Sequence, residues 1–67
     1  MDIELFIERE NSTKSIIFNG RAVFELLRQA SLNPETVIVV RSGEVLTEKE
    51  ILHDKDRIEL LSVISGG

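Results

Sequence analysis

The chain of 67 residues is long enough for one small domain, and its 42% hydrophobic and 30% charged residues are typical of a folded protein. It contains no cysteine, which excludes disulfides and thiolate metal sites and favours a cytoplasmic location. Eight basic and twelve acidic residues give a net charge of −4, and because the basic residues are scattered singly we expect no direct nucleic-acid partner. The apolar runs are too short to span a bilayer, so we expect no membrane partner either.

Two strands are predicted near the N-terminus. In residues 3–8 apolar and mostly acidic side chains alternate, which is the pattern of a half-buried strand. Residues 9–12 are polar and turn-like, and residues 13–18 are predicted to form a second strand that pairs with the first as a hairpin. Phe6 falls on the polar face of the first strand, where it is either a lone exposed aromatic side chain or a contact for a partner.

The apolar spacing changes at Val23 and predicts a helix. One face of this helix carries Val23, Leu26, Leu27 and Ala30, at the spacing i, i+3, i+4 and i+7. Asn19 or Gly20 is predicted to cap the start of the helix. Asn33-Pro34 is predicted to end it, because proline disfavours helical geometry in the residue before it.

Two further strands and a short helix are predicted in the middle of the chain. Residues 37–40 are four consecutive β-branched residues, which is typical of a strand covered on both faces. A turn at Ser42-Gly43 leads into a short strand at 44–46. The sequence Thr47–Glu50 is a capping box with Leu46 and Ile51 placed as a hydrophobic staple around it, and it predicts a one-turn helix.

The last strand is predicted at residues 57–63, after a turn at 54–56. One helix covers only one face of a sheet, so the other face is expected to stay partly exposed. Ile58 and Leu60 would face the helix, while Leu61 and Val63 would point to the open face together with Glu59. If Ile38 and Val40 also point outward, the open face carries a candidate docking patch of Ile38, Val40, Leu61 and Val63. Alternatively, these four residues are core residues of a thin sheet, which would give the same sequence pattern.

The sequence ends on Ser65-Gly66-Gly67. Two glycines at this place add nothing to a core, but they make a thin, extended thread with a free carboxylate. Such a thread can enter a narrow channel in a partner protein, whereas a frayed terminus is the plainer interpretation. We therefore expect a folded domain of residues 1–64 and a flexible tail of residues 65–67.

Three segments carry a resemblance to a known family. Residues 20–27, Gly-Arg-Ala-Val-Phe-Glu-Leu-Leu, look like a helix opening of the type glycine-x-threonine-valine-x-glutamate-leucine-leucine. Residues 54–61 look like the approach to a last strand, and residues 63–67 look like a carrier tail. In this order and spacing they resemble the β-grasp sulfur-carrier family: the thiamine-pathway carrier (ThiS), the small subunit of molybdopterin synthase (MoaD) and related ubiquitin-like modifiers. Two residues depart from its pattern, Ala22 in place of threonine and Lys55 in place of a turn glycine.

The resemblance implies an α+β fold of the β-grasp (ubiquitin-like) type, with a mixed sheet of about five strands on one main helix and a short second helix. It also implies that an adenylating enzyme similar to ubiquitin-activating enzymes uses ATP and Mg²⁺ to activate the Gly67 carboxylate. A persulfide donor would then convert Gly67 to a thiocarboxylate for an acceptor synthase, in thiamine or molybdopterin biosynthesis or in tRNA thiolation. Ile64, Ser65 and Gly66 would lie in the partner's channel.

In this interpretation the protein is the substrate of another enzyme, with no cofactor or metal of its own and no catalytic residue. The lone His53 has no thiol or hydroxyl partner in a recognisable arrangement, and capping and turn chemistry explain the acidic residues Glu48, Glu50, Asp54 and Asp56. Two alternatives remain open. One is a ubiquitin-like modifier joined through Gly67 to lysines of a target protein. The other is a non-covalent β-grasp interaction module.

Overall fold

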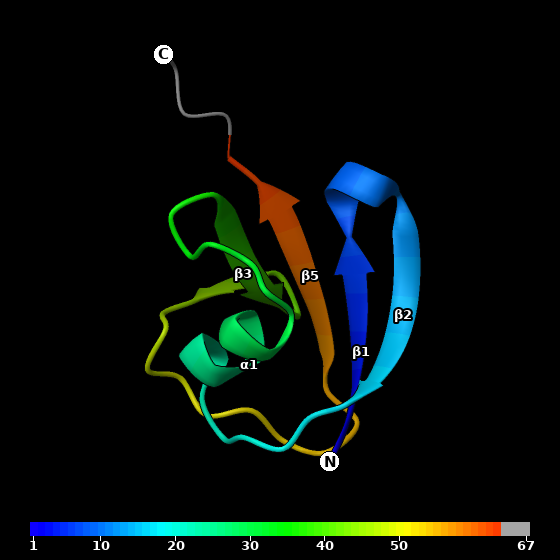
Figure 1. The fold of residues 1–67 in the computed structure, drawn as a ribbon, viewed down its shortest axis with the longest axis vertical. Helices are drawn as coiled ribbons and strands as arrows, with labels where there is room; N and C mark the ends of the chain where they lie inside the picture. The colour runs from blue at the N-terminus through cyan, green and yellow to red at the C-terminus, as the bar shows by residue number, and fades with distance from the viewer. Residues whose placement is uncertain (64–67) are drawn as a thin grey trace.

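The computed structural model describes residues 1–63, which form a mixed sheet with one α-helix packed across one face (Figure 1). The elements in chain order are β1 (Asp2–Ile7), the 3-10 helix η1 (Glu8–Glu10), β2 (Ser12–Ile17), α1 (Val23–Gln29), β3 (Val37–Arg41), β4 (Glu44–Leu46) and β5 (Arg57–Ser62). The five strands lie in the order β2-β1-β5-β3-β4. The predicted α+β architecture of five strands and one main helix is therefore confirmed. Within residues 1–63 no helix is long and apolar enough to cross a membrane.

The central strand is β5, which runs parallel to β1 and antiparallel to β3. Its apolar residues Ile58 and Leu60 are buried against α1, as the alternation in the sequence predicts. All the buried side chains that form the main core cluster are apolar: Ile3, Leu5, Phe18, Val23, Leu26, Leu27, Val39, Leu46, Leu52, Ile58 and Leu60. The core thus lies between α1 and one face of the sheet.

The start of α1 is capped by a distant segment together with the Glu25 side chain, whose Oε1 accepts the Arg21 and Ala22 N–H groups at 3.3 Å. The N-cap residue is Ala22, whose side chain has no acceptor. The Val23 N–H donates to the Glu50 carbonyl at 2.9 Å, and the Phe24 N–H donates to the Glu48 carbonyl at 3.0 Å. These bonds satisfy two of the donors that every helix leaves free at its first turn. The predicted capping role of Asn19 or Gly20 is therefore wrong.

The same contacts explain why Thr47–Glu50 forms a single turn and no helix. The Glu50 N–H reaches the Thr47 carbonyl at 3.1 Å, and Ile51 then forms an isolated bridge with Ala22. A helix here would direct its carbonyls along its own axis and leave the first turn of α1 without acceptors. The predicted one-turn helix is thus wrong, and so is the staple, because Ile51 is 46% exposed while Leu52 is buried.

The end of α1 is formed by Ser31, which has a left-handed backbone with φ 58°. The Leu32 N–H donates to the Leu27 carbonyl at 2.8 Å, and the Ser31 N–H donates to the Arg28 carbonyl at 3.1 Å. These two bonds define a Schellman motif. The helix therefore ends before Asn33-Pro34, and the prediction was wrong. The motif was not recognisable in the sequence because serine stands at the position where this motif usually has glycine.

Replacing Ser31 with glycine is expected to stabilise the protein by about 0.5–1 kcal/mol, since glycine relieves the left-handed strain at a small entropic cost. Urea unfolding followed by circular dichroism measures the difference. The matched control is Ser15→Gly in β2, where an exposed serine has a strand conformation and glycine should destabilise. A loss of stability in Ser31→Gly as large as that in Ser15→Gly would contradict this explanation.

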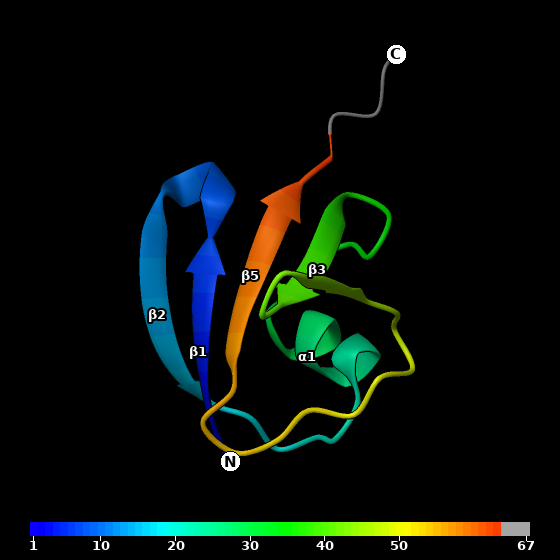
Figure 2. The ribbon, with the colours of Figure 1, turned by 180° about the vertical axis from the view of Figure 1, so that it is seen from behind.

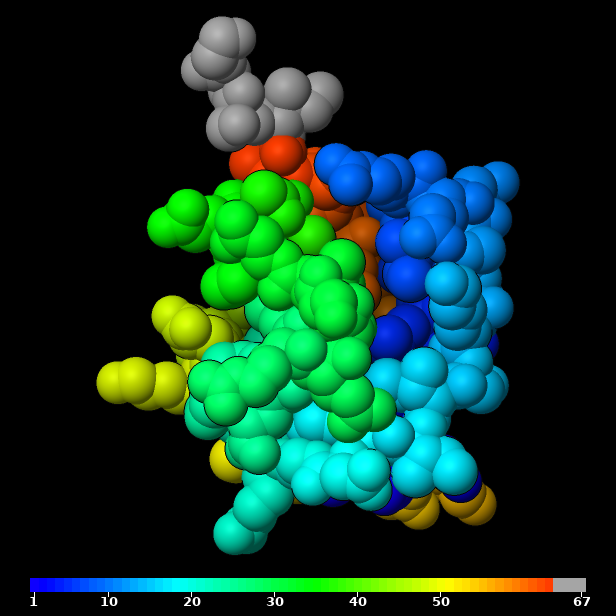
Figure 3. All heavy atoms as spheres, in the orientation of Figure 1, coloured from blue at the N-terminus to red at the C-terminus, as the bar shows by residue number. Residues whose placement is uncertain are grey.

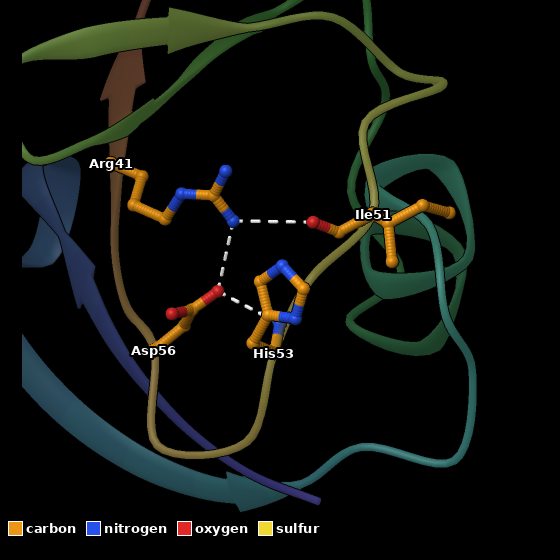
Figure 4. Close-up of polar contacts among 4 residues, drawn as sticks. All are labelled: Arg41, Ile51, His53 and Asp56. Carbon is orange, nitrogen blue, oxygen red and sulfur yellow. Dashed lines mark hydrogen bonds and ion pairs between the residues drawn. The ribbon is translucent and has the colours of Figure 1, made fainter.

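The loop before β5 is tied to β3 by a half-buried ion pair (Figure 4). Arg41 Nη1 donates to Asp56 Oδ2 at 2.9 Å and to the Ile51 carbonyl at 3.2 Å. The same Asp56 oxygen accepts the His53 N–H at 2.8 Å. Lys55 in this turn has φ 68°, so a lysine adopts the left-handed conformation that glycine adopts most readily. The contacts fix the point at which β5 begins.

Candidate functional site

The site predicted from the sequence begins where β5 leaves the sheet. This end of β5 lies at the opposite end of the molecule from the N-terminus, next to η1 and the loop before β3 (Figure 1). The Val63 N–H donates to the Thr36 carbonyl at 2.9 Å, and the Ser62 N–H contacts Glu8 Oε1 at 3.4 Å. The chain is therefore held on both sides at its last described residues. Ile64, Ser65, Gly66 and Gly67 lie outside the described residues.

A compact turn positions the carbonyl that holds Val63. The Thr36 N–H and Thr36 Oγ1 both donate to the Asn33 carbonyl, at 3.0 and 2.9 Å. Asn33 Oδ1 accepts the Glu35 N–H at 2.9 Å, which is an Asx turn. We name this turn (residues 33–36) together with Glu8 the tail clamp. Its role was missed in the sequence, although asparagine before proline and a threonine at the fourth position are turn signals.

The strands β3 and β5, which carry the predicted docking residues, lie side by side in the sheet (Figure 2). Ile38 lies opposite Leu61 and Val40 opposite Glu59 in the β3–β5 register. Because Val39 and Leu60 belong to the core on the other face, these pairs must point away from α1. The register thus assigns Ile38 and Val40 to the open face, a point that the apolar run 37–40 leaves open.

The four residues of this patch differ in how much surface they offer. Ile38 is 39% and Val63 is 38% exposed, while Leu61 is half-buried and Val40 is only 9% exposed. Val45, which lies opposite Val40 in β4, is 69% exposed and extends the apolar surface toward that edge. Val45 was not predicted to be part of this surface, because a strand of three residues is too short for its alternation to show which face Val45 is on.

Phe6 also lies on the open face, opposite Glu59 in the β1–β5 register, and it is half-buried. Its ring therefore adjoins the central strand and is not isolated on the surface. His53 takes part in the tertiary structure through its backbone N–H and has an exposed side chain. In the part of the chain that the structure describes, no group of three or more histidine, aspartate or glutamate residues is placed to hold a metal ion.

The fold is that of ubiquitin-like proteins. A solved structure of a ubiquitin-like protein from the hyperthermophilic archaea Caldiarchaeum subterraneum matches it with a TM-score of 0.58. The match covers 98% of this chain and 100% of that chain at 18% sequence identity. At this identity the likeness concerns the fold alone, and it confirms the ubiquitin-like β-grasp class.

The sequence gives the more specific assignment. The model of the ThiS family matches residues 5–67, so the chain belongs to the ThiS family. The sulfur carrier protein TtuB of Thermus thermophilus is 47% identical to it over 48 residues, which are 72% of this chain and 74% of that protein. The resemblance drawn from the helix opening, the last strand and the tail is therefore confirmed.

Proposed function

We propose that this protein is a sulfur carrier that bears sulfur as a thiocarboxylate on Gly67. Membership of the ThiS family and the likeness to a sulfur carrier protein support this role. The observation that carries the proposal is the tail clamp, which holds the chain at Ser62 and Val63, directly before residues 64–67. Fully extended, these four residues reach about 14 Å. That length takes the carboxylate away from the folded domain and into a partner's channel.

The chemistry belongs to the partner, and the carrier is its substrate. A carboxylate is a poor acyl donor, so a Gly67 oxygen attacks the α-phosphorus of ATP, releases pyrophosphate and forms an acyl-adenylate in the activating enzyme, which also holds the Mg²⁺. The terminal sulfur of a persulfide then attacks the carbonyl carbon and displaces AMP. A second thiol cleaves the resulting acyl disulfide, forming an ordinary disulfide and leaving the thiocarboxylate. Gly66 and Gly67 contribute by having no side chains that would block the channel.

The open-face patch is proposed as the surface on which the activating enzyme or the acceptor docks. It adjoins the point where Val63 leaves the sheet, so a partner that covers it also surrounds the tail. Thiamine biosynthesis, molybdopterin biosynthesis and tRNA thiolation are all compatible acceptor pathways. Conjugation of Gly67 to target lysines is the second candidate function, since the activated intermediate would be the same and only the nucleophile differs.

Intact mass measurement after incubation with ATP, Mg²⁺, an adenylating enzyme from the same organism and a persulfide donor tests the proposal. The expected gain equals the mass difference between sulfur and oxygen, and it should disappear when Gly66 and Gly67 are deleted. Lys49→Ala, an exposed change away from the tail clamp, should load normally. No gain with an enzyme shown to be competent on another carrier would contradict the proposal. Adducts on lysines of other proteins would favour the modifier.

The docking role of the patch is tested in the same assay. Ile38→Asp should raise KM for the activating enzyme or the acceptor by about tenfold, because a buried carboxylate would meet an apolar partner surface. The matched control is Ile17→Asp, since Ile17 in β2 is 67% exposed and lies away from β5. Equal KM values for the two variants would contradict the docking role of the patch but not the proposed chemistry at Gly67.

A further inference from the structure

A second apolar surface lies at the edge of the sheet formed by β4. It is an open groove of about 210 Å³ between α1 and the β3–β4 hairpin. Its lining includes Val23 and Leu27 of α1, Val37 to Val39 of β3, Val45 and Leu46 of β4, and Pro34 and Glu48. In Figure 3 the loop before β3 (green) and the segment after β4 (yellow) flank this side of the molecule. Pro34 belongs both to the groove and to the turn of the tail clamp, so the groove adjoins the clamp, but the carrier chemistry does not use the groove.

An unpaired strand edge runs along this groove. β4 pairs with Val39, Val40 and Arg41, so within residues 1–63 the first two residues of β3 have no partner strand on that side. The Val63 N–H to Thr36 carbonyl bond and the β3–β5 register direct the polar backbone groups of Thr36 and Ile38 toward β5. By alternation, the N–H and C=O of Val37 point to the uncovered edge. An extended segment placed there gains backbone hydrogen bonds beside an apolar groove.

The charge around the groove is acidic. Glu48 lines the groove, and Glu35, Glu44 and Glu50 are exposed on the neighbouring segments. Lys49 is the one basic residue between positions 44 and 50. The ion pairs found within residues 1–63 use Glu10, Asp56 and Glu4 instead of any of these four glutamates. The groove therefore favours cations and repels phosphates and acidic peptides.

We propose that this groove binds an extended, basic segment of a partner protein that carries one large apolar side chain. That side chain fills the groove between Leu27 and Leu46, the backbone of the segment pairs with Val37, and its lysine or arginine side chains contact Glu48 and the neighbouring carboxylates. The groove opens at the β4 edge of the sheet and shares Ile38 and Val45 with the apolar surface of the open face. A partner bound in the groove therefore also covers that end of the open face. The proposal does not depend on the sulfur chemistry.

Amide chemical shifts of the isotope-labelled protein, recorded during titration with the peptide acetyl-Lys-Arg-Val-Leu-Val-Arg-Lys-amide, test the proposal. The largest shifts are expected at Val37, Leu46 and Glu48, and binding should weaken as salt is added. A peptide with alanine in place of the central leucine should bind at least tenfold more weakly. Largest shifts at Leu61 and Glu59, or no binding at millimolar peptide, would overturn the proposal.

Charge reversal supplies the second arm of the test. Glu48→Lys should weaken binding of the peptide by about tenfold, because like charges then meet across the groove. The matched control is Glu59→Lys, the same change at an exposed position on the open face, which should leave the affinity within twofold of wild type. Both side chains are exposed, so both variants are expected to fold. Equal affinities for the two variants would also overturn the proposal.

Discussion

Replacing Gly66 with valine is expected to lower the rate of ATP-dependent loading at Gly67 by at least about a hundredfold. A branched side chain next to the reacting residue would keep the carboxylate from the α-phosphate, and a displacement of about 1 Å can cost a factor of this size. Within the described residues 1–63 the main core cluster extends from Ile3 to Leu60, and β5 ends at Ser62. The variant should therefore keep the thermal midpoint of the wild type.

Loading is followed by intact mass over time at saturating activating enzyme, and the thermal midpoint is measured by circular dichroism. The matched control is Thr13→Val, which puts the same side chain at an exposed position in β2, away from the tail. It should load at the wild-type rate. If Gly66→Val also loads at that rate, the tail does not enter a narrow channel, and the role assigned to the two glycines is wrong.

Replacing Ile58 with alanine is expected to destabilise the protein by about 2–5 kcal/mol. Ile58 is 0% exposed and lies in the central strand β5, opposite Leu5 of β1. The truncation removes buried apolar surface and leaves a cavity between α1 and the sheet. A domain of this length has a total stability of only about 3–10 kcal/mol, so the variant loses a large part of it.

Urea unfolding followed by circular dichroism gives the free energy of unfolding for this comparison. Ile17→Ala is the same substitution at a position that is 67% exposed, and it should cost less than about 0.5 kcal/mol. Near-equal losses in the two variants would contradict the assignment of Ile58 to the core. Because β5 leads directly to the tail clamp, we also expect Ile58→Ala to slow loading at temperatures where it is partly unfolded.

The parts of the fold that depend on periodicity were predictable from the sequence. The spacing of Val23, Leu26 and Leu27 specifies one buried helix face, and all three are buried. The alternation in β5 puts Ile58 and Leu60 in the core, as the structure has them. In such segments the burial of each side chain follows from its position along its own strand or helix, so no distant residue is needed to read it.

The parts that depend on distant partners were not predictable. Thr47–Glu50 has the residues of a capping box, but the first N–H groups of α1 take carbonyls of this segment, which forms a single turn instead of a helix. The outward direction of Ile38 follows from its pairing with Leu61, which is far away in sequence. The contact of Glu8 with Ser62 likewise joins the two ends of the described chain. For the candidate site, the sequence named the residues of the patch and of the tail as predictions, but it did not indicate the contacts that hold Ser62 and Val63.

The parallel pairing of β1 with β5 also determines how the molecule responds to mechanical load. The two strands are joined by four registered residue pairs, and the N-terminus and the exit of β5 lie at opposite ends of the molecule (Figure 1). Tension applied between the N-terminus and the tail therefore acts along the strands and shears all of these pairs at once. Peeling the same strands apart from one end would break the hydrogen bonds one after another at much lower force. A partner can thus pull on the tail without unzipping the sheet that presents it.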